Sequence, residues 1–199
     1  MMTILKRSLF VFLLTMGLAS CANMAPPAPS VHINTDTRQA SLNQIKHWQI
    51  SGKIAVQTSK DSGSATVNWL QNQKSFQLTL MGPLGTNSLK LSGSDHQVTL
   101  ETANGKTFSA ATPEQLLAKQ WGFNVPVSYL HYWIRGLPVP NVPADSQFDT
   151  YGRLSTLKQE DWQVLFLAYT RVASIDLPAK IAITSAALKV KIIVYQWKI

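Results

Sequence analysis

Short runs in which apolar and polar residues alternate, divided by turn signals, most constrain what this chain of 199 residues can fold into. An antiparallel strand with one buried face requires an apolar side chain at every second position. Five such runs are Trp48–Val56, Ala65–Trp69, Phe76–Leu80, Leu89–Leu91 and Val98–Leu100. Turn signals separate them, and Asn104-Gly105 after the last run is typical of a two-residue hairpin. The spacing predicts an antiparallel meander.

Helix signals interrupt this pattern at three places. Residues 37–45 carry apolar residues at helical spacing and predict a short amphipathic helix. Thr112-Pro113-Glu114-Gln115 combines a capping threonine, a proline at the first helical position and a glutamine at the capping-box position, so a second helix should follow. A third is expected between Pro126 and Gly136. We expect a loop over residues 137–147 and further strands over residues 151–157, 162–169, 180–184 and 188–197.

The first twenty residues have the features of a bacterial secretory leader. Lys6 and Arg7 precede an apolar run, residues 9–16, that is too short to span a bilayer. The leader closes on Leu-Ala-Ser-Cys, residues 18–21, which resembles the lipobox at which a cysteine is acylated. An incidental cysteine after an ordinary leader is the alternative, but charge, apolar run, small residues and cysteine occur in the expected order. We therefore predict acylation of Cys21.

Three segments follow from this leader. Residues 1–20 are the predicted signal peptide, and residues 21–36 are the predicted lipidated N-terminus and flexible tether, because their Pro, Ala, Ser and short polar residues cannot bury a core. Residues 37–199 are predicted to form one domain. Acyl chains anchor a protein without spanning the membrane. Ala22 in place of aspartate points, by analogy with enterobacterial sorting signals, to the outer membrane, with the domain in the periplasm.

Charge and cysteine content exclude several classes of protein. Lys and Arg outnumber Asp and Glu by 18 to 10, but the basic residues are dispersed, which argues against nucleic-acid binding. A single cysteine excludes an intrachain disulfide and cysteine-rich zinc sites. The positive balance favours an acidic partner, either a protein surface or anionic head groups. Dispersed surface lysines without a partner are the alternative.

Five segments together resemble the LolB family of outer-membrane lipoprotein receptors. They are Trp48–Val56 with the pattern Trp-x-x-x-Gly-Lys-Ile-Ala-Val, Gly82-Pro83-Leu84-Gly85, Tyr132–Pro138, Tyr151–Leu154 and Asp161-Trp162. The resemblance extends from the lipobox to the carboxyl terminus and depends on the order and spacing of the segments. It implies a mainly β (α+β) fold, in which a strongly curved antiparallel sheet forms an incomplete barrel. Short helices would cover this sheet and enclose a hydrophobic cavity.

The same resemblance implies a function. A LolB-type receptor takes lipoproteins from the periplasmic carrier LolA, holds their acyl chains in its cavity and places them in the inner leaflet of the outer membrane. We therefore expect LolA, acylated lipoprotein cargo and outer-membrane lipid as partners, and a monomer that uses no cofactor, metal or nucleic acid. The acidic partner would then be the surface of LolA, with anionic head groups as the alternative.

Seven apolar residues are candidates for the cavity lining: Trp69, Leu78, Leu80, Leu89, Leu100, Trp133 and Ile134. Alternating strands can supply such a lining if their inner face is not filled by side chains. The residues alone, without the family resemblance, favour the alternative that these side chains pack a closed core. The family resemblance favours the cavity.

The turn Gly82-Pro83-Leu84-Gly85 is a candidate membrane-insertion loop. Proline fixes the second position of such a turn and the glycines tolerate tight geometry, which would put Leu84 at the tip. The alternative from the residues is a leucine folded back onto the protein. The resemblance implies that Leu84, between Pro83 and Gly85, protrudes and inserts cargo into the membrane.

Catalysis is disfavoured. Ser92, Ser94, Asp95 and His96 are neighbours in a turn and cannot converge on one reacting atom, and no nucleophile elbow is present. The histidines lack metal-ligand spacing, so we expect neither catalytic residues nor a metal site. Arg135 and Arg153 are expected to make structural ion pairs or hydrogen bonds, with a role at the cavity mouth as the alternative. Two rival functions are a structural lipoprotein that scaffolds an envelope complex and a lipid-modifying enzyme.

Overall fold

The computed structural model describes residues 34–85, 88–94, 97–121 and 125–199. All of these belong to one unit of the chain, His32–Ile199. The predicted leader, Cys21 and the predicted tether up to residue 33 lie outside the described residues, as do Asp95 and His96.

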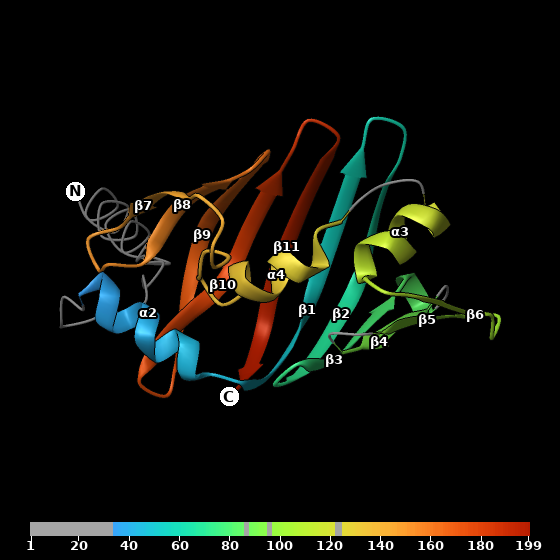
Figure 1. Ribbon diagram of the computed structural model, residues 1–199, viewed down its shortest axis with the longest axis horizontal. Coiled ribbons are helices and arrows are strands. Elements are labelled where there is room, and N and C mark those ends of the chain that lie inside the picture. Colours follow the sequence, from blue (N-terminus) through green and yellow to red (C-terminus); the bar gives the residue numbers. More distant parts are fainter. Residues whose placement is uncertain (1–33, 86–87, 95–96, 122–124) are drawn as a thin grey trace, which may run out of the picture. The chain divides into compact units, whose positions relative to one another are not determined.

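Eleven antiparallel strands form one sheet, in the order β6-β5-β4-β3-β2-β1-β11-β10-β9-β8-β7 (Figure 1). The strands are β1 (His47–Thr58), β2 (Ser62–Asn72), β3 (Ser75–Met81), β4 (Leu89–Gly93), β5 (Val98–Thr102), β6 (Thr107–Ala110), β7 (Asp145–Phe148), β8 (Leu154–Gln159), β9 (Trp162–Val172), β10 (Ile175–Thr184) and β11 (Leu188–Lys198). The first and last strands pair at the centre, and the short edge strands β6 and β7 do not pair with each other. The sheet is therefore an open one, which confirms the predicted mainly β fold.

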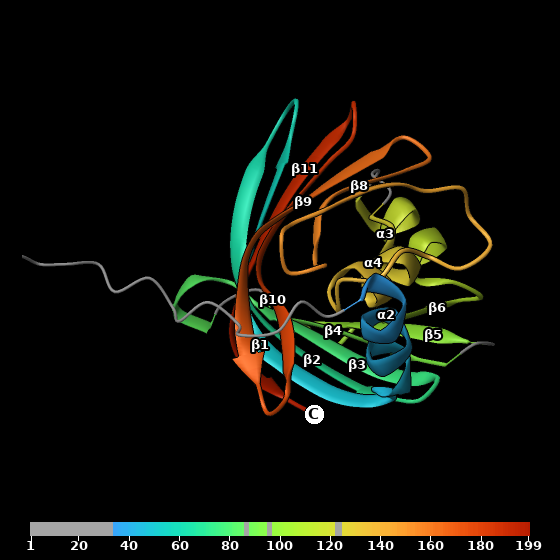
Figure 2. The ribbon, with the colours of Figure 1, turned by 90° about the vertical axis from the view of Figure 1, so that its left-hand side faces the viewer.

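A bulge between Ser51 and Gly52 bends the central pair β1–β11. Gly52 is required there because a Cβ on this residue would lie 2.0 Å from the backbone oxygen of Ile193. Bulges bend a strand and increase its local twist. Figure 2 shows the sheet curving around the helices. The bulge lies in the strand pair that connects the half of the sheet formed by β1–β6 with the half formed by β7–β11.

The helices lie on the concave side of the sheet (Figure 2). They are α2 (Thr35–Gln44), α3 (Pro113–Trp121) and α4 (Val127–Trp133), and a 3₁₀ turn, η1 (Pro83–Gly85), joins β3 to β4. Thr112 caps α3 as predicted, since its hydroxyl accepts a hydrogen bond from the Gln115 N–H at 3.2 Å. After α4 the chain turns at Gly136 with φ of +78°. None of the helices in the described ranges is long and apolar enough to cross a membrane.

Two predicted boundaries were wrong because side chains of short polar residues organise the backbone locally. The helix predicted over residues 37–45 begins at Thr35, because the Asn34 side chain accepts a hydrogen bond from the Asp36 N–H at 2.9 Å. The strand predicted from Tyr151 begins at Leu154, because the Asp149 carboxylate accepts from the N–H groups of Tyr151 and Arg153. The Asp149 carboxylate thereby holds the residues between Asp149 and the start of the strand in a turn.

Two further differences involve proline. The predicted loop over residues 137–147 is wrong at its end, where Asp145 starts the edge strand β7, paired on one side with β8. Strand β10 begins at Ile175 rather than at Lys180, because Pro178 lies within the strand beside a register irregularity. Proline is tolerated at such bulges, so its presence hid the first half of the strand from the sequence pattern.

The two halves of the sheet are packed differently. Over β8 to β10 the inward-facing side chains are almost completely buried, and Leu157, Val164 and Leu177 each have 0% exposure. Over β1, β3 and β4 the inward-facing Ile54, Leu78, Leu80 and Leu89 remain only half-buried. Packing of the apolar face is thus close in one half and incomplete in the other.

Candidate functional site

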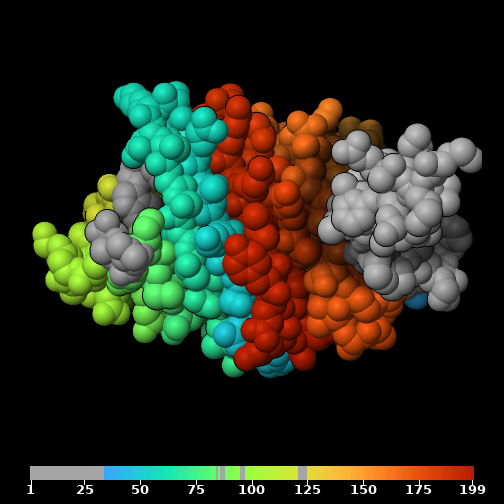
Figure 3. Space-filling model, turned by 180° about the vertical axis from the view of Figure 1, so that it is seen from behind, coloured from blue at the N-terminus to red at the C-terminus, as the bar shows by residue number. Residues whose placement is uncertain are grey.

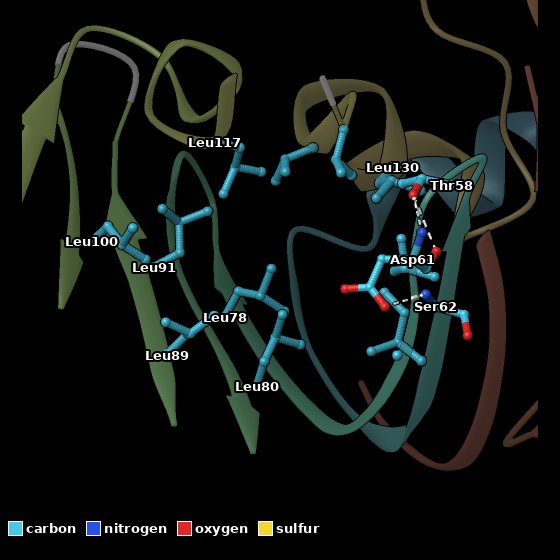
Figure 4. A pocket seen from close by; sticks show the side chains of 15 residues that line it. Thr58, Asp61, Ser62, Leu78, Leu80, Leu89, Leu91, Leu100, Leu117 and Leu130 are labelled. Carbon is cyan, nitrogen blue, oxygen red and sulfur yellow. Dashed lines mark hydrogen bonds between the residues drawn. The ribbon is translucent and has the colours of Figure 1, made fainter. Parts of the chain in front are cut away.

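An apolar cavity of about 360 Å³ occupies the incompletely packed half. Strands β1 to β5 form its floor and walls, and helices α3 and α4 cover it (Figure 4). The lining residues are Ile54, Val56, Thr58, Asp61, Ser62, Gly63, Leu78, Leu80, Leu89, Leu91, Leu100, Leu117, Val125, Val127 and Leu130. Figure 4 shows the labelled leucines of β3, β4 and β5 pointing into the space below α3 and α4. Its volume is in the range of small-molecule binding sites.

Four of the seven residues predicted for the lining contribute to this cavity: Leu78, Leu80, Leu89 and Leu100. They extend from three neighbouring strands and meet through the register, with Leu78 opposite Leu91 and Leu91 opposite Leu100. Leu91, Ile54 and Val56 also line the cavity and were not predicted, although each continues the alternation of its strand. Leu117 was not predicted either, because no strand register connects this helical residue with the sheet.

The other three predicted residues are not part of this lining. Trp69 packs against Trp48, with ring centroids 5.2 Å apart, and donates a hydrogen bond to the Gln71 side chain at 3.0 Å. Trp133 and Ile134 have 0% exposure. The Trp133 indole donates to the Gln159 side chain at 2.9 Å, which fixes the end of α4 against β8. These side chains belong to the closely packed core.

The β1–β2 hairpin forms one side of the cavity mouth. Thr58 and Asp61 close the hairpin, since the Asp61 N–H donates to the Thr58 hydroxyl at 2.9 Å and the Thr58 N–H donates to the Asp61 carbonyl at 2.8 Å. The Asp61 carboxylate accepts from the Ser62 N–H at 2.7 Å (Figure 4). The polar groups at this rim are thus hydrogen-bonded within the hairpin, while leucine, isoleucine and valine side chains predominate farther inside.

The turn η1 lies next to two residues of the cavity lining. Leu80 precedes the turn, Leu89 follows it, and both line the cavity. The Gly85 N–H donates to the Gly82 carbonyl at 3.1 Å, and Gly85 has a φ of +75°, a conformation that favours glycine. Pro83 and Gly85 are exposed. The side chain of Leu84 lies outside what the structure describes.

Two arginines make structural contacts outside the cavity. The Arg135 guanidinium donates to the carbonyls of Leu42 and Ile45, at 3.4 and 3.1 Å, and so ties the end of α2 to α4. Burial lowers the pKa of Arg135. Arg153 contacts the carboxylates of Asp149 at 2.7 Å and Asp176 at 3.5 Å. The prediction that Arg135 and Arg153 make structural contacts is confirmed.

Arg38 of α2 acts in the same way on β10. Its guanidinium donates to the backbone carbonyl of Asp176 and lies 5.5 Å from the centroid of the Tyr169 ring. Burial lowers the pKa of Arg38 and raises the pKa of Tyr169. Because these groups are held by structural partners, their pKa shifts reflect packing of α2 on the sheet. Among the described residues, no group of three or more His, Cys, Asp or Glu side chains could hold a metal ion.

Comparison with known proteins gives two consistent results. The family model described as "Outer membrane lipoprotein LolB" matches residues 46–197. A protein of Pseudomonas savastanoi pv. phaseolicola named "Outer-membrane lipoprotein LolB" is 36% identical over 197 residues, 96% of each chain. A protein of the same name from Pseudomonas putida is 40% identical over 157 residues, 79% of this chain and 77% of its own length.

A solved structure agrees at the level of the fold. The structure of a LolA superfamily protein from Nitrosomonas europaea superposes with a TM-score of 0.54 and 7% sequence identity. The superposition covers 84% of this chain and 94% of the other. The open curved sheet with helices on its concave face is therefore a fold that this chain shares with that protein.

Proposed function

The chain belongs to the LolB family of outer-membrane lipoproteins, and from this premise we propose that it is a receptor that delivers lipoproteins to the outer membrane. Family and fold together support a role in lipoprotein localization. In the proposed cycle the protein is anchored by acylated Cys21, with its domain facing the periplasm. It accepts an acylated lipoprotein from LolA, holds the acyl chains in its cavity and inserts them into the inner leaflet.

The observation that carries this proposal is the apolar cavity itself. A protein interior is normally packed to the density of an organic crystal, and unfilled apolar space costs stability. Here about 360 Å³ remains open beneath α3 and α4, although the other half of the same sheet is closely packed. An acyl chain in water exposes many methylenes, each of which gains roughly 0.8 kcal/mol when buried. Cargo lipid is therefore a chemically matched occupant.

The chemistry required of the site is physical transfer. The lining offers apolar contacts and a rim of hydrogen-bonded polar groups, with Asp61 engaged by its own hairpin. Binding strength that depends on buried apolar area lets the cargo move onward wherever a larger apolar phase is in contact. Acyl chains would then pass from carrier to cavity to bilayer without a cofactor.

A direct test is transfer in solution. Cys21→Ala, produced as the mature chain behind a cleavable leader, gives a form without its own anchor. We expect this form to remove an acylated lipoprotein from LolA and to co-purify with acyl chains, measured by gel filtration and mass spectrometry. If the Cys21→Ala form folds but takes up no cargo, the result would contradict the receptor function. It would favour the rival function, that of a lipoprotein that scaffolds an envelope complex.

A further inference from the structure

A lysine-lined hollow lies on the outer face of the sheet, opposite the helices. Its volume is about 700 Å³, and its lining includes Lys189, Lys191, Ser62, Ser64 and Thr184. Alternation along β11 explains this arrangement, because Leu188, Val190 and Ile192 are buried on the inner face while Lys189 and Lys191 are exposed. Figure 3 views this face, with β11 at its centre between β1 and β10.

Cross-strand register adds two more lysines beside this hollow. One row across five strands runs from Met81 through Thr66, Lys53 and Ile193 to Lys180. Neighbouring strands are about 4.8 Å apart, so the four lysines of β1, β11 and β10 lie within roughly 10–15 Å of one another. Over β1, β2, β11 and Lys180–Thr184, all of which the structure describes, no outward-facing residue is acidic. The dispersed lysines of the sequence are thus gathered into one acid-free surface.

The lysine hollow and the cavity mouth share a rim. Val56, Ser62 and Gly63 of the β1–β2 hairpin line both spaces, the apolar cavity from inside and the hollow from outside. Met81 belongs to the row that contains Lys53 and Lys180, and the turn η1 begins two residues after Met81. In Figure 2 the green turn η1 projects on the side of the sheet away from α3 and α4. Lys189 and Lys191 therefore lie beside the cavity mouth, and the row with Lys53 and Lys180 crosses the middle of the same outer face.

Exposed apolar side chains border the same surface. Tyr195 of β11 is 65% exposed and Leu167 of β9 is 50% exposed, and both flank the strand that carries Lys180. Tyrosine is enriched at membrane–water interfaces, and lysine can extend its charge to head groups while its stem contacts apolar surface. Lysines gathered beside hydroxyl groups match the phosphates of a lipid surface.

We propose that this outer face, centred on Lys53, Lys180, Lys189 and Lys191, binds the anionic head groups of the bilayer and holds the cavity mouth against the membrane. This inference rests on the proposed receptor function and adds a second attachment to it. The lipid anchor keeps the protein at the membrane, whereas the lysine face fixes its orientation. Orientation matters because a tethered domain that rotates freely would present its mouth to the bilayer only part of the time.

The test uses the acylated full-length protein in vesicles of phosphatidylcholine, with and without phosphatidylglycerol. Gln57→Cys places a fluorophore on the outer face, where residue 57 lines the hollow, and lipids with a head-group quencher report contact. Acylated Cys21, the single native cysteine, leaves residue 57 as the only free thiol. We expect quenching that requires phosphatidylglycerol and weakens with added salt.

A triple variant tests the lysines, and a second triple variant matches its charge. Lys53→Gln, Lys189→Gln and Lys191→Gln change exposed side chains, and the ratio of membrane-facing to free orientations should fall on the order of 100-fold. Lys46→Gln, Lys106→Gln and Lys119→Gln also remove three exposed lysines, but from elsewhere in the fold, and should leave quenching unchanged.

Three outcomes would overturn the proposal, and a fourth would contradict only the receptor function on which it rests. Quenching that is equal without phosphatidylglycerol, or that survives in the first triple variant, would show that the lysines do not bind head groups. If that variant keeps its quenching and loses uptake from LolA, the face binds an acidic protein instead. Cargo delivery by wild-type protein is measured in the same vesicles. Delivery without quenching contradicts this inference alone, and quenching without delivery contradicts the proposed function alone.

Discussion

At the scale of single residues, the side chains that line the cavity and those that fill the core come from the same alternation. Leu78 and Leu157 both point from a strand to the concave side, yet Leu78 is half-buried at the cavity and Leu157 is completely buried. Periodicity predicts which face a residue occupies. It does not predict what lies opposite that face, and this is why Trp133 and Ile134 were expected in the lining but lie in the core.

The role proposed for Leu84 leads to a prediction at the same scale. Burial of one leucine in lipid contributes roughly 1.5–3 kcal/mol, which is enough to orient the mouth but not to anchor the protein. Leu84→Glu would place a charge at the membrane surface. We expect folding and cargo uptake from LolA to be unchanged and release into liposomes to be blocked, as measured by flotation of labelled cargo. Release at the wild-type rate would contradict the assignment.

At the scale of elements, the sequence predicted most strands and all three described helices, but not every boundary. Regular alternation, as in β1 and in the first part of β11, predicted these strands correctly. Errors occurred where a side chain reorganises the backbone or where proline lies within a strand, as at Asp149 and Pro178. Such features depend on hydrogen bonds and register with a partner strand, which residue propensities do not contain.

The close approach of β1 to β11 at Gly52 leads to a prediction about stability. Gly52→Ala would put a Cβ 2.0 Å from the Ile193 carbonyl oxygen, so the central strand pair would have to shift. We expect this substitution to lower the free energy of unfolding by about 3 kcal/mol, measured by urea denaturation. Gly63→Ala is the matched control, because nothing lies within 4 Å of a Cβ at that position of β2. Equal stability of the two variants would show that the close approach at Gly52 does not constrain the sheet.

At the scale of the whole described unit, one sheet supports two different surfaces. Its concave side is closely packed in one half and hollow in the other, while its outer side gathers lysines that are far apart in the sequence, from Lys53 to Lys191. The sequence gives the net positive charge but cannot show that these lysines share one face, because β1 and β11 are brought together only by the fold. In the proposed cycle the two surfaces work together, one holding acyl chains and the other the membrane.

Binding of acyl chains in the cavity is the central claim, and photo-cross-linking from the cargo tests it most directly. A lipoprotein whose acyl chains carry a photoreactive group is transferred from LolA to this protein, irradiated and mapped by mass spectrometry. We predict adducts on cavity residues such as Leu78, Leu89 and Leu117. Adducts confined to exposed outer residues such as Leu70, which is 49% exposed, would contradict the account.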